Sequence, residues 1–460
     1  MTPALGDVAS LPASPPDRAR RSTVTRRTFV GGAMATVALP QLVDADRAGS
    51  RKRHTLLLVI DDMAELVSDA SVQTPHLDAL ARQSVVYHEA HAPVAICASS
   101  RAAFLTGISP DVSGLVGHHD RYLGAGCDPC YLDVLSHPSV FDQAHRRGFR
   151  TEGYGKISHG PAPGHANWFD VSDLGQEIQT PYLAEVTNDP TAQNVGSAWW
   201  SLVPKAGSHP DSRIASTAAK RIRMIDRRSR RPCLIAVGIS QPHMPWRIPA
   251  RFWNAYRGVD LSHLVEGWER GRADLADVPA AGHWERAERA VAAKATGMEE
   301  EIVRAYCAAV SFADAKVGRV MRNVPDDWSV VVTSDHGWML GEKLTHSKAT
   351  AWRSATRVPA MVRIAGQAPT VVNRPVTLLD LPQTVLGAMA GEARGWARPR
   401  PYVNTWWETT KTVYWRDLHY LQHGDGSGEL YHLTKDPRER DNLMAAGKRP
   451  SVLNRLRRML

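Results

Sequence analysis

The chain has 460 residues, of which 43% are hydrophobic and 22% charged, values typical of a globular enzyme with one large domain and a smaller one. The formal net charge is +9, but residues 1–53 hold nine Lys or Arg and four Asp, so more than half of the excess lies in this first stretch. The rest of the chain has no long basic run with interleaved aromatic residues, which argues against a nucleic-acid partner.

Residues 1–45 are predicted to be an export signal. Arg26 and Arg27 precede Phe29 and an apolar stretch rich in Gly and Ala that ends at Leu39. Paired arginines before a modest apolar stretch are typical of a twin-arginine signal peptide. The stretch is short for a membrane span. We expect export by the twin-arginine translocase to the periplasm or the cell exterior, with no membrane attachment after processing; a disordered basic tail is the alternative.

Apolar runs alternate with helical patterns over residues 51–395, which is the predicted catalytic domain. Strands are expected at 54–60, 85–90, just before Gly155, 233–239 and 329–333. Helices are expected from Pro75 to 81, and at 97–107, 140–147, 212–226, 299–322 and 379–389. Residues 165–215 are predicted as loops with short helices, and 258–296 as a charged helical insertion. This alternation predicts an α/β fold with a large, mostly parallel sheet between helices.

Residues 396–460 differ in character from the preceding domain. Short alternating segments at 412–415, 418–422 and 429–433 predict antiparallel strands, and a helical pattern closes the chain. We expect a small C-terminal antiparallel α+β subdomain.

Polar residues follow the predicted strands, where parallel sheets place their sites. They are Asp61, Asp62, Lys156, His159, His243, Asp335 and His336. Two adjacent acids after one strand and an Asp-His pair after another suggest a divalent cation held by carboxylate oxygens. Each group has a structural alternative, a helix cap or a polar turn. However, all of these residues follow strands and so fall at the same edge of the predicted sheet, which favours a common site.

Cys97 begins a predicted helix of small residues, and Arg101 follows it by one turn on the same face. Unpaired N–H groups and the helix dipole at such a position favour an anion or a nucleophile, which Arg101 can also reach. A buried structural cysteine beside a structural arginine is the alternative. The five cysteines of the chain cannot all pair; Cys127 and Cys130 are interpreted as two thiols in a surface turn, with a metal site or a small disulfide loop as alternatives.

Residues 97–107 resemble the signature of the type I sulfatases, Cys-x-Pro-x-Arg followed by a small-residue helix and Thr-Gly, with Ser99 in place of the proline. Other family-like segments follow in family order. They are Asp61-Asp62, Gly155-Lys156-x-x-His159, Pro242-His243-x-Pro245, Ser334-Asp335-His336-Gly337-Trp338, the loop 341–348 with Lys348, and residues 429–443. The match runs from about residue 56 to 443 and is most similar to the iduronate-2-sulfatase-like branch of this alkaline-phosphatase-like superfamily.

The resemblance implies a sulfuric ester hydrolase in which a formylglycine-generating enzyme oxidises Cys97. The hydrated formylglycine would attack sulfur and form a covalent sulfo-enzyme. The resemblance also implies a calcium or magnesium ion on Asp61, Asp62, Asp335, His336 and the modified residue 97. By the same resemblance, Arg101, Lys156 and Lys348 neutralise charge on the sulfuryl oxygens, His243 protonates the leaving alcohol and His159 deprotonates the remaining hydroxyl.

Two other functions stay open at this stage. A phosphate or phosphonate ester hydrolase of the same superfamily fits if Ser99 prevents oxidation of Cys97, since a thiol is a poor sulfuryl acceptor. An exported protein that binds sulfated glycans without catalysis is the third. The expected substrate is an anionic ester, either a sulfated saccharide such as a uronate 2-sulfate or a small alkyl or aryl sulfate.

Overall fold

The computed structural model describes residues 52–67, 69–117, 134–159, 168–174, 193–195, 198–203, 209–228, 231–282, 297–445 and 451–460. The predicted signal peptide and the pair Cys127 and Cys130 lie outside these residues. No helix in the described ranges has the length and apolar character needed to cross a membrane.

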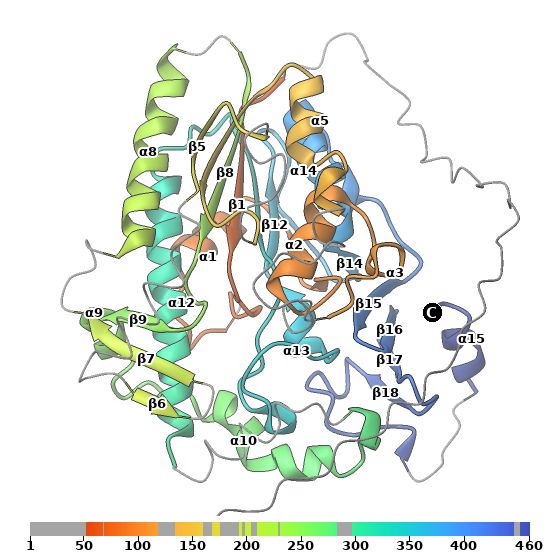
Figure 1. Cartoon of the computed structure of the whole chain (residues 1–460). Coiled ribbons are helices and arrows are strands. Elements are labelled where there is room, and N and C mark those ends of the chain that lie inside the picture. Colours follow the sequence, from red (N-terminus) through yellow and green to blue (C-terminus); the bar gives the residue numbers. More distant parts are fainter. Residues whose placement is uncertain are drawn as a thin grey trace, which may run out of the picture. The chain divides into compact units, whose positions relative to one another are not determined.

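An eight-stranded sheet organises the main part of the fold, in the order β13-β2-β12-β10-β1-β8-β4-β5 (Figure 1). Its strands are β1 (Thr55–Ile60), β2 (Val85–Tyr87), β4 (Arg150–Gly155), β5 (Val171–Asp173), β8 (Cys233–Ile239), β10 (Ser329–Ser334), β12 (Ala360–Arg363) and β13 (Thr370–Val372). β1 is parallel to β8 and β10, and β4 is parallel to β8 and β5. Only β12 runs antiparallel to its neighbours β10 and β2. The predicted α/β class with a mostly parallel sheet is confirmed.

Helices cover both faces of this sheet (Figure 1). The helices described before the C-terminal segment, not all of which touch this sheet, are α1 (Pro75–Ala81), α2 (Cys97–Thr106), α3 (Pro110–Ser113), α5 (Val140–Arg146), α8 (Pro210–Arg228), α9 (Ala250–Asn254), α10 (Ser262–Leu275), α12 (Glu299–Met321), α13 (Arg353–Thr356) and α14 (Leu381–Ala390). Alternate residues of β1 enter two different cores, as the period of a strand requires. Leu56 and Leu58 pack with residues of α1, α8 and α12, whereas Leu57 and Val59 pack with residues of α2, α5 and α14.

The register of the central strands places their ends at one level. Ile60 lies opposite Ile239 of β8 and Ser334 of β10. The residues that follow β1 and β10, Asp61 and Asp335, therefore emerge side by side at the carboxyl edge of the sheet. This is the edge at which the site was expected.

The structure corrects the expectation for residues 165–215. The described part contains strands β5, β6 (Gln193–Val195) and β7 (Ala198–Val203) instead of loops with short helices. β7 pairs antiparallel with the preceding β6 and in parallel with β9 (Trp246–Pro249), so one of its two partners comes from a segment far along the chain that local patterns do not reveal. The predicted strand at 85–90 is two strands in different sheets, because β3 (Ala90–His91) pairs with β11 (Arg357–Val358) and β14 (Val376–Thr377). Helix α10 lies within the predicted charged insertion 258–296, of which residues 283–296 are outside the described part.

The C-terminal segment forms a four-stranded antiparallel sheet of β15 (Val403–Trp407), β16 (Thr410–Trp415), β17 (Leu418–Gln422) and β18 (Gly428–His432), followed by α15 (Leu453–Arg457). Side chains alternate between its faces. Tyr420 and Leu430 pack against α15, whereas Leu421 and Tyr431 join the main core. The backbone N–H of Trp406 donates to the Pro93 carbonyl at 2.8 Å, which brings this sheet beside the segment that leads into α2.

Candidate active site

Cys97 is the first residue of α2, after Ile96 in extended conformation. Its Sγ lies 3.0 Å from Lys348 Nζ, 3.3 Å from His336 Nε2 and 3.7 Å from Asp62 Oδ1. Burial by itself raises the pKa of the thiol, but the nearby charges of Lys348, Lys156 and His336 hold the Cys97 pKa well below its usual value. These charges favour the thiolate form, and a thiol in contact with cationic groups has the surroundings of a reactive cysteine and not of an inert structural one.

Arg101 is completely buried one turn further along α2. Its Nε donates to Asp335 Oδ2 at 3.0 Å and its Nη2 to Asp61 Oδ1 at 2.8 Å. Nη1 donates to the carbonyl oxygens of Lys156 and Ile157 at 2.8 and 2.9 Å. Four of the five N–H groups of the guanidinium are therefore used within the protein. These contacts favour a positioning role over the predicted contact with sulfuryl oxygens.

Two lysines neutralise the adjacent acids after β1. Lys156 Nζ donates to Asp61 Oδ2 and Lys348 Nζ to Asp62 Oδ1, each at 2.5 Å. Burial is the largest single influence and opposes ionisation of Asp61, but the charges of Lys156 and Arg101 and the other favourable contacts together hold the pKa of the carboxyl well below its ordinary value. Both lysines are nearly buried and close to Cys97, so they reach the same small volume as the thiolate.

The acids and His336 form a donor set that fits a divalent cation. Ligand atoms of Asp62, Cys97, Asp335 and His336 all lie within 4.8 Å of one another, and Asp61, Asp62 and His243 form a second such group. The buried Asp62 Oδ2 accepts no hydrogen bond from any described residue. Burial, and then the charge of Asp61, raise the pKa of Asp335 to about 7. Carboxylates crowded in this way, with an unused oxygen among them, suit the oxygen-rich coordination of calcium or magnesium.

The two predicted acid–base histidines contact different members of this cluster. His243 Nε2 is 4.0 Å from Asp62 Oδ2, and its side chain is 21% exposed. Its orientation is fixed by the contact of Nδ1 with the Met244 carbonyl and by Gln241 Nε2, which donates to the His243 carbonyl at 3.1 Å. His159, after β4, forms a hydrogen bond with the Cys97 side chain. The structure thus brings all the predicted site residues together at one edge of the sheet.

Comparison with known proteins places the chain in a family. A family model described as Sulfatase matches residues 53–392. The chain belongs to the sulfatase family. It is 26% identical over 433 residues to a sulfatase of Formosa agariphila, with 84% of this chain and 82% of the relative aligned. It is 27% identical to iduronate 2-sulfatase of Mus musculus, over 68% of this chain and 60% of that relative. The motifs therefore predicted the family correctly, and the protein is an enzyme that hydrolyses sulfate esters.

A solved structure supports the fold of this sulfatase. The phosphonate monoester hydrolase of Agrobacterium radiobacter matches it with a TM-score of 0.62 and 18% identity, and the match covers 89% of this chain and 95% of that one. At this identity the likeness shows the fold alone, and it agrees with the predicted alkaline-phosphatase-like architecture.

The sulfatase site contains a supporting residue that the sequence did not single out. Tyr306 lies on the buried face of α12, where its position in an apolar stripe predicted only a core residue. Its hydroxyl donates to the Asp62 carbonyl at 2.7 Å and accepts from the Ala64 N–H at 2.8 Å. Ser334 adds a second support, because its hydroxyl accepts from the Met63 N–H at 2.9 Å. Together they fix the backbone turn that carries both acids.

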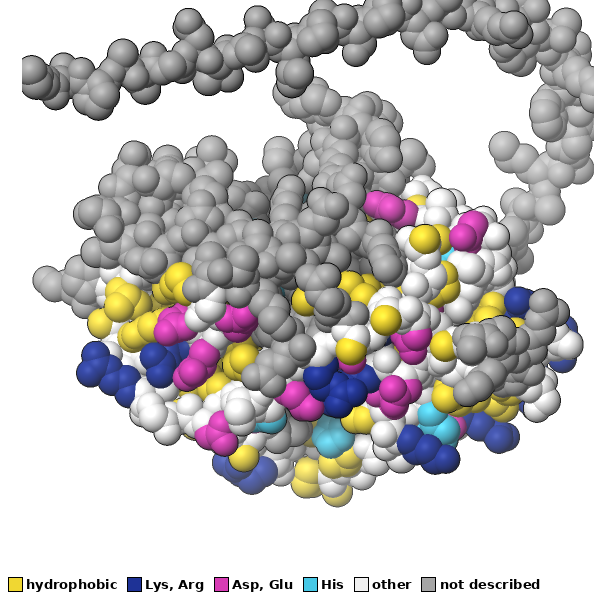
Figure 2. All heavy atoms as spheres, turned by 90° about the horizontal axis from the view of Figure 1, so that it is seen from below, with side chains coloured by type: hydrophobic (Ala, Val, Ile, Leu, Met, Phe, Trp, Pro, Cys, Tyr) yellow, Lys and Arg dark blue, Asp and Glu magenta, His cyan; other side chains and the backbone are white. Residues whose placement is uncertain are grey.

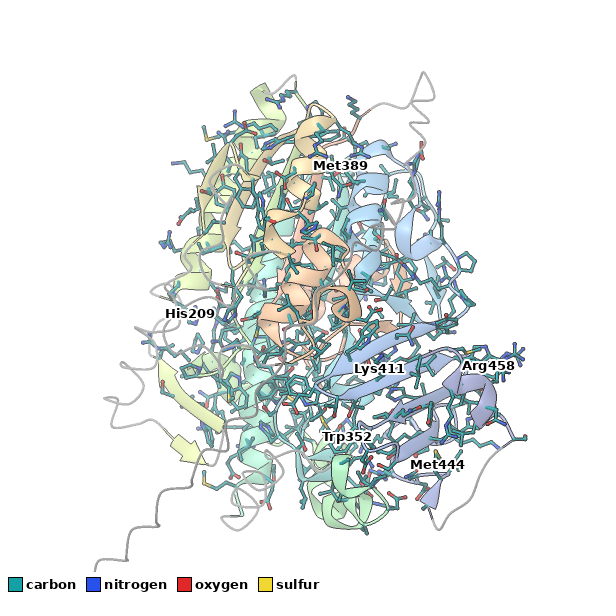
Figure 3. The ribbon with its side chains drawn as sticks, turned by 45° about the vertical axis from the view of Figure 1, so that its right-hand side comes forward. His209, Trp352, Met389, Lys411, Met444 and Arg458 are labelled. Atoms are coloured by element: carbon teal, nitrogen blue, oxygen red, sulfur yellow. The ribbon has the colours of Figure 1, made fainter. Side chains whose placement is uncertain are left out.

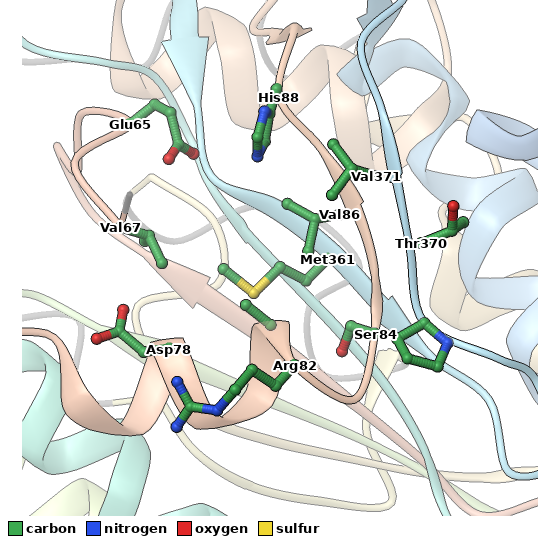
Figure 4. Close-up of a pocket in the computed structure, with 12 residues that line it drawn as sticks. Glu65, Val67, Asp78, Arg82, Ser84, Val86, His88, Met361, Thr370 and Val371 are labelled. Carbon is green, nitrogen blue, oxygen red and sulfur yellow. The ribbon is translucent and has the colours of Figure 1, made fainter. Parts of the chain in front are cut away.

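A separate cavity of about 460 Å³ lies away from the acid cluster of the sulfatase (Figure 4). Val86, Met361 and Val371 form much of its wall, with Glu65 and Arg82 at different points of its rim. None of the predicted site residues lines it. Its position does not change the assignment of the site to the edge at Cys97.

Proposed function

We propose that this sulfatase removes a sulfate group from a sulfated saccharide, using formylglycine made from Cys97 and a calcium or magnesium ion. The observation that carries the proposal is the position of Cys97. It begins α2, touches Lys348 and His336, and lies against Asp62. A relative named iduronate 2-sulfatase supports a sugar sulfate as the substrate class.

The acids and His336 account for how the ion would be held. Asp62, Asp335 and His336 would supply donors together with residue 97, and Asp61 would join them from the second group, which shares Asp62. A bound divalent cation supplies Lewis-acid polarisation of a sulfate oxygen, and formylglycine supplies an oxygen nucleophile. Arg101 and Tyr306 keep the acids in fixed positions, which limits reorganisation when the anionic ester binds.

Lys156 and Lys348 have a direct electrostatic task in this proposal. Each ammonium group contacts one acid and lies near residue 97, so an anion bound over that residue meets two positive charges. Charge on the sulfuryl oxygens is stabilised there in a site of low dielectric. The sequence predicted that Arg101 also contacts the sulfuryl oxygens. In this proposal Arg101 instead holds the acids in position.

We assign the two proton transfers of the reaction to His243 and His159 according to where each histidine lies in the site. The His243 side chain is 21% exposed and stands beside Asp62, where a leaving alcohol can exit to solvent, so it donates the proton to that alcohol. His159 contacts the side chain of residue 97 and takes the proton that must leave that residue in the second half-reaction.

A second function is favoured by one specific observation. The thiol of unmodified Cys97 already has a strongly lowered pKa and a hydrogen bond from Lys348. Ser99 stands where the family has proline, and its hydroxyl donates to the Gly117 carbonyl at 2.8 Å. If Ser99 prevents oxidation, this thiolate suits attack on a phosphate or phosphonate ester, the alternative activity of the superfamily.

The proposal extends to processing and location. A formylglycine-generating enzyme would act on Cys97 before export, and residues 1–45 would direct the chain to the twin-arginine translocase. This order is consistent because that route exports folded proteins, so modification in the cytoplasm precedes transport.

The deciding experiment is the mass of the tryptic peptide 83–101 from protein made in its native host. Conversion of Cys97 to formylglycine makes the peptide lighter by about 18 Da. Cys97→Ala is the control, since its peptide cannot undergo this change. A peptide that carries only unmodified cysteine overturns the formylglycine mechanism, and phosphonate and phosphate esters then become the substrates to test.

A further inference from the structure

The positive charge of the folded chain is concentrated near its C-terminus. Residues 54–399 contain 36 basic and 36 acidic residues, whereas residues 400–460 contain 11 basic and 7 acidic ones. Both signs are interspersed on the face that Figure 2 shows, in keeping with this balance. Residues 448–460 hold five Lys or Arg and no acid. The excess therefore has a definite location that the catalytic site does not explain.

Helix α15 presents this charge to solvent. Leu453 and Leu456 are buried against the C-terminal sheet, whereas Arg455, Arg457 and Arg458 are exposed. In Figure 3, Arg458 points away from the sheet. Because the apolar side of the helix is already covered, the surface that it offers to a partner is polar and consists mainly of guanidinium groups, of which that of Arg457 also donates to the Tyr420 hydroxyl at 3.3 Å.

A tryptophan of the same sheet holds two of the charges in place. The Cζ atoms of Arg416 and Arg455 lie 4.5 and 4.6 Å from the centre of the Trp415 ring. Among the described residues, none of Arg416, Arg455, Arg457 and Arg458 has a carboxylate within 4.0 Å. The nearby Asp417 pairs with His432 at 3.0 Å. Two like charges held against one ring repel one another, and a bound anion relieves that repulsion.

We propose that Arg416, Arg455, Arg457 and Arg458 around Trp415, here called the basic surface, bind a sulfated polysaccharide at a distance from the reacting ester. This inference rests on the proposed function, in that the enzyme acts on sulfated saccharides. Guanidinium groups form paired hydrogen bonds with sulfate oxygens, and a polymer presents many such groups. A chain held on the basic surface raises the local concentration of esters near the catalytic site.

Other polyanions fit the basic surface less well. The Trp415 ring is engaged by two guanidinium groups, so it offers no stacking platform to a nucleobase. The apolar residues of α15 are buried against the sheet, so the helix lacks the exposed apolar face that insertion into a lipid surface requires.

The test compares two charge-reversal variants of the full-length enzyme. Arg455→Glu/Arg458→Glu changes the basic surface, and Lys220→Glu/Arg223→Glu makes the same change in net charge at exposed residues of α8. Binding to dextran sulfate is measured at 50 and 200 mM salt, with uncharged dextran, duplex DNA and anionic lipid vesicles as comparisons. We expect the first variant to bind dextran sulfate at least tenfold more weakly, with a smaller salt dependence, and the α8 variant to remain within twofold of the wild type.

Equal losses in the two variants would show an effect of net charge only and would overturn the proposal. DNA or vesicles bound as tightly as dextran sulfate would overturn the assignment to a sulfated polysaccharide. Hydrolysis of 4-nitrophenyl sulfate is measured in parallel and is expected to be unchanged in both variants. If the basic-surface variant loses dextran sulfate binding but still hydrolyses 4-nitrophenyl sulfate, the basic surface acts separately from the catalytic site. If the wild type binds dextran sulfate but does not hydrolyse 4-nitrophenyl sulfate, the catalytic proposal alone fails.

Discussion

The indole N–H of Trp352 donates to the Glu429 carboxylate across 3.0 Å, and this bond joins the C-terminal sheet to the segment that carries Lys348. Glu429 is fully buried and also accepts from His423 Nε2 at 2.9 Å and from the Tyr431 hydroxyl. The ammonium group of Lys343 lies 5.4 Å from the centre of the Trp352 ring and 4.9 Å from that of Tyr431. Figure 3 shows Trp352 beside the C-terminal sheet. The sheet thus supports the loop that carries Lys348.

Glu429→Gln is expected to weaken both the fold and the reaction. Three donors converge on this carboxylate. In the glutamine variant an NH₂ group replaces one of the two acceptor oxygens, so one buried donor loses its partner. We expect this to lower the free energy of unfolding by about 2–4 kcal/mol. We also expect kcat for a small aryl sulfate to fall about tenfold with little change in KM, because Lys348 loses its support. Urea unfolding and steady-state kinetics measure the two effects. Glu392→Gln, at a half-exposed pair with Arg394, is the control and should change stability by less than about 0.5 kcal/mol.

Tyr306→Phe should lower the affinity of the site for calcium by about 10- to 100-fold, the range seen when an outer-shell partner of a metal ligand is removed. The lost hydroxyl bridges the backbone on either side of Met63, next to Asp62. Calorimetric titration of the metal-free enzyme with calcium measures the effect. Tyr256→Phe is matched in burial, and its hydroxyl bonds Ser311 at 2.7 Å and the Gln73 N–H at 2.9 Å. It should lose comparable stability and keep its calcium affinity; an equal loss of affinity in both variants would contradict the role of Tyr306.

Arg101→Lys should be severely damaging although it keeps the charge. A lysine has one nitrogen and cannot satisfy two acids and two carbonyl groups at four different positions. We expect destabilisation of about 3–5 kcal/mol, because buried Asp61 and Asp335 lose part of their compensation. Thermal unfolding followed by circular dichroism, with and without calcium, measures it. A stability equal to that of the wild type would contradict the positioning role.

Asp314 gives a pH dependence that is independent of the catalytic site. Burial raises the pKa of its carboxyl to about 7, against the lowering effect of the Leu77 and His76 N–H groups at the start of α1. The folded chain therefore keeps this proton up to about pH 7, whereas the unfolded chain releases it near pH 3.8. The neutral form contributes stability fully below pH 3.8, and this contribution is lost as the pH rises to about 7.

Asp314→Asn remains neutral at every pH, so its stability relative to the wild type should rise by up to about 4 kcal/mol between pH 4 and 7, from a starting value lowered by the one backbone N–H that the amide nitrogen cannot accept. Urea unfolding at pH 4.5, 5.5 and 7 measures the difference. A constant difference between the two proteins over this range would show that Asp314 does not hold a proton in the folded state.

Local pattern alone determined a large part of this protein. The apolar runs of β1, β8 and β10 identify buried strands because a parallel strand covered on both faces contains almost no polar residue. The polar residues that follow these runs were therefore predicted to meet, and the small-residue helix that begins at Cys97 indicated this residue as the candidate nucleophile. The apolar stripe of α12 likewise identified its buried face.

The tertiary structure decided the partners of these residues. Arg101 bonds Asp335, which lies 234 positions further along the chain, and Trp352 bonds Glu429, 77 positions away. No local period encodes such pairs, since they depend on how separate segments pack and on the register of β1 with β10. β7 was missed for the same reason, because its strand is completed by β9. The sequence alone determined which chemical groups the site contains. The packing of distant segments decided the contacts among these groups, including those of Arg101 with Asp61 and Asp335 and of Tyr306 with the Asp62 carbonyl.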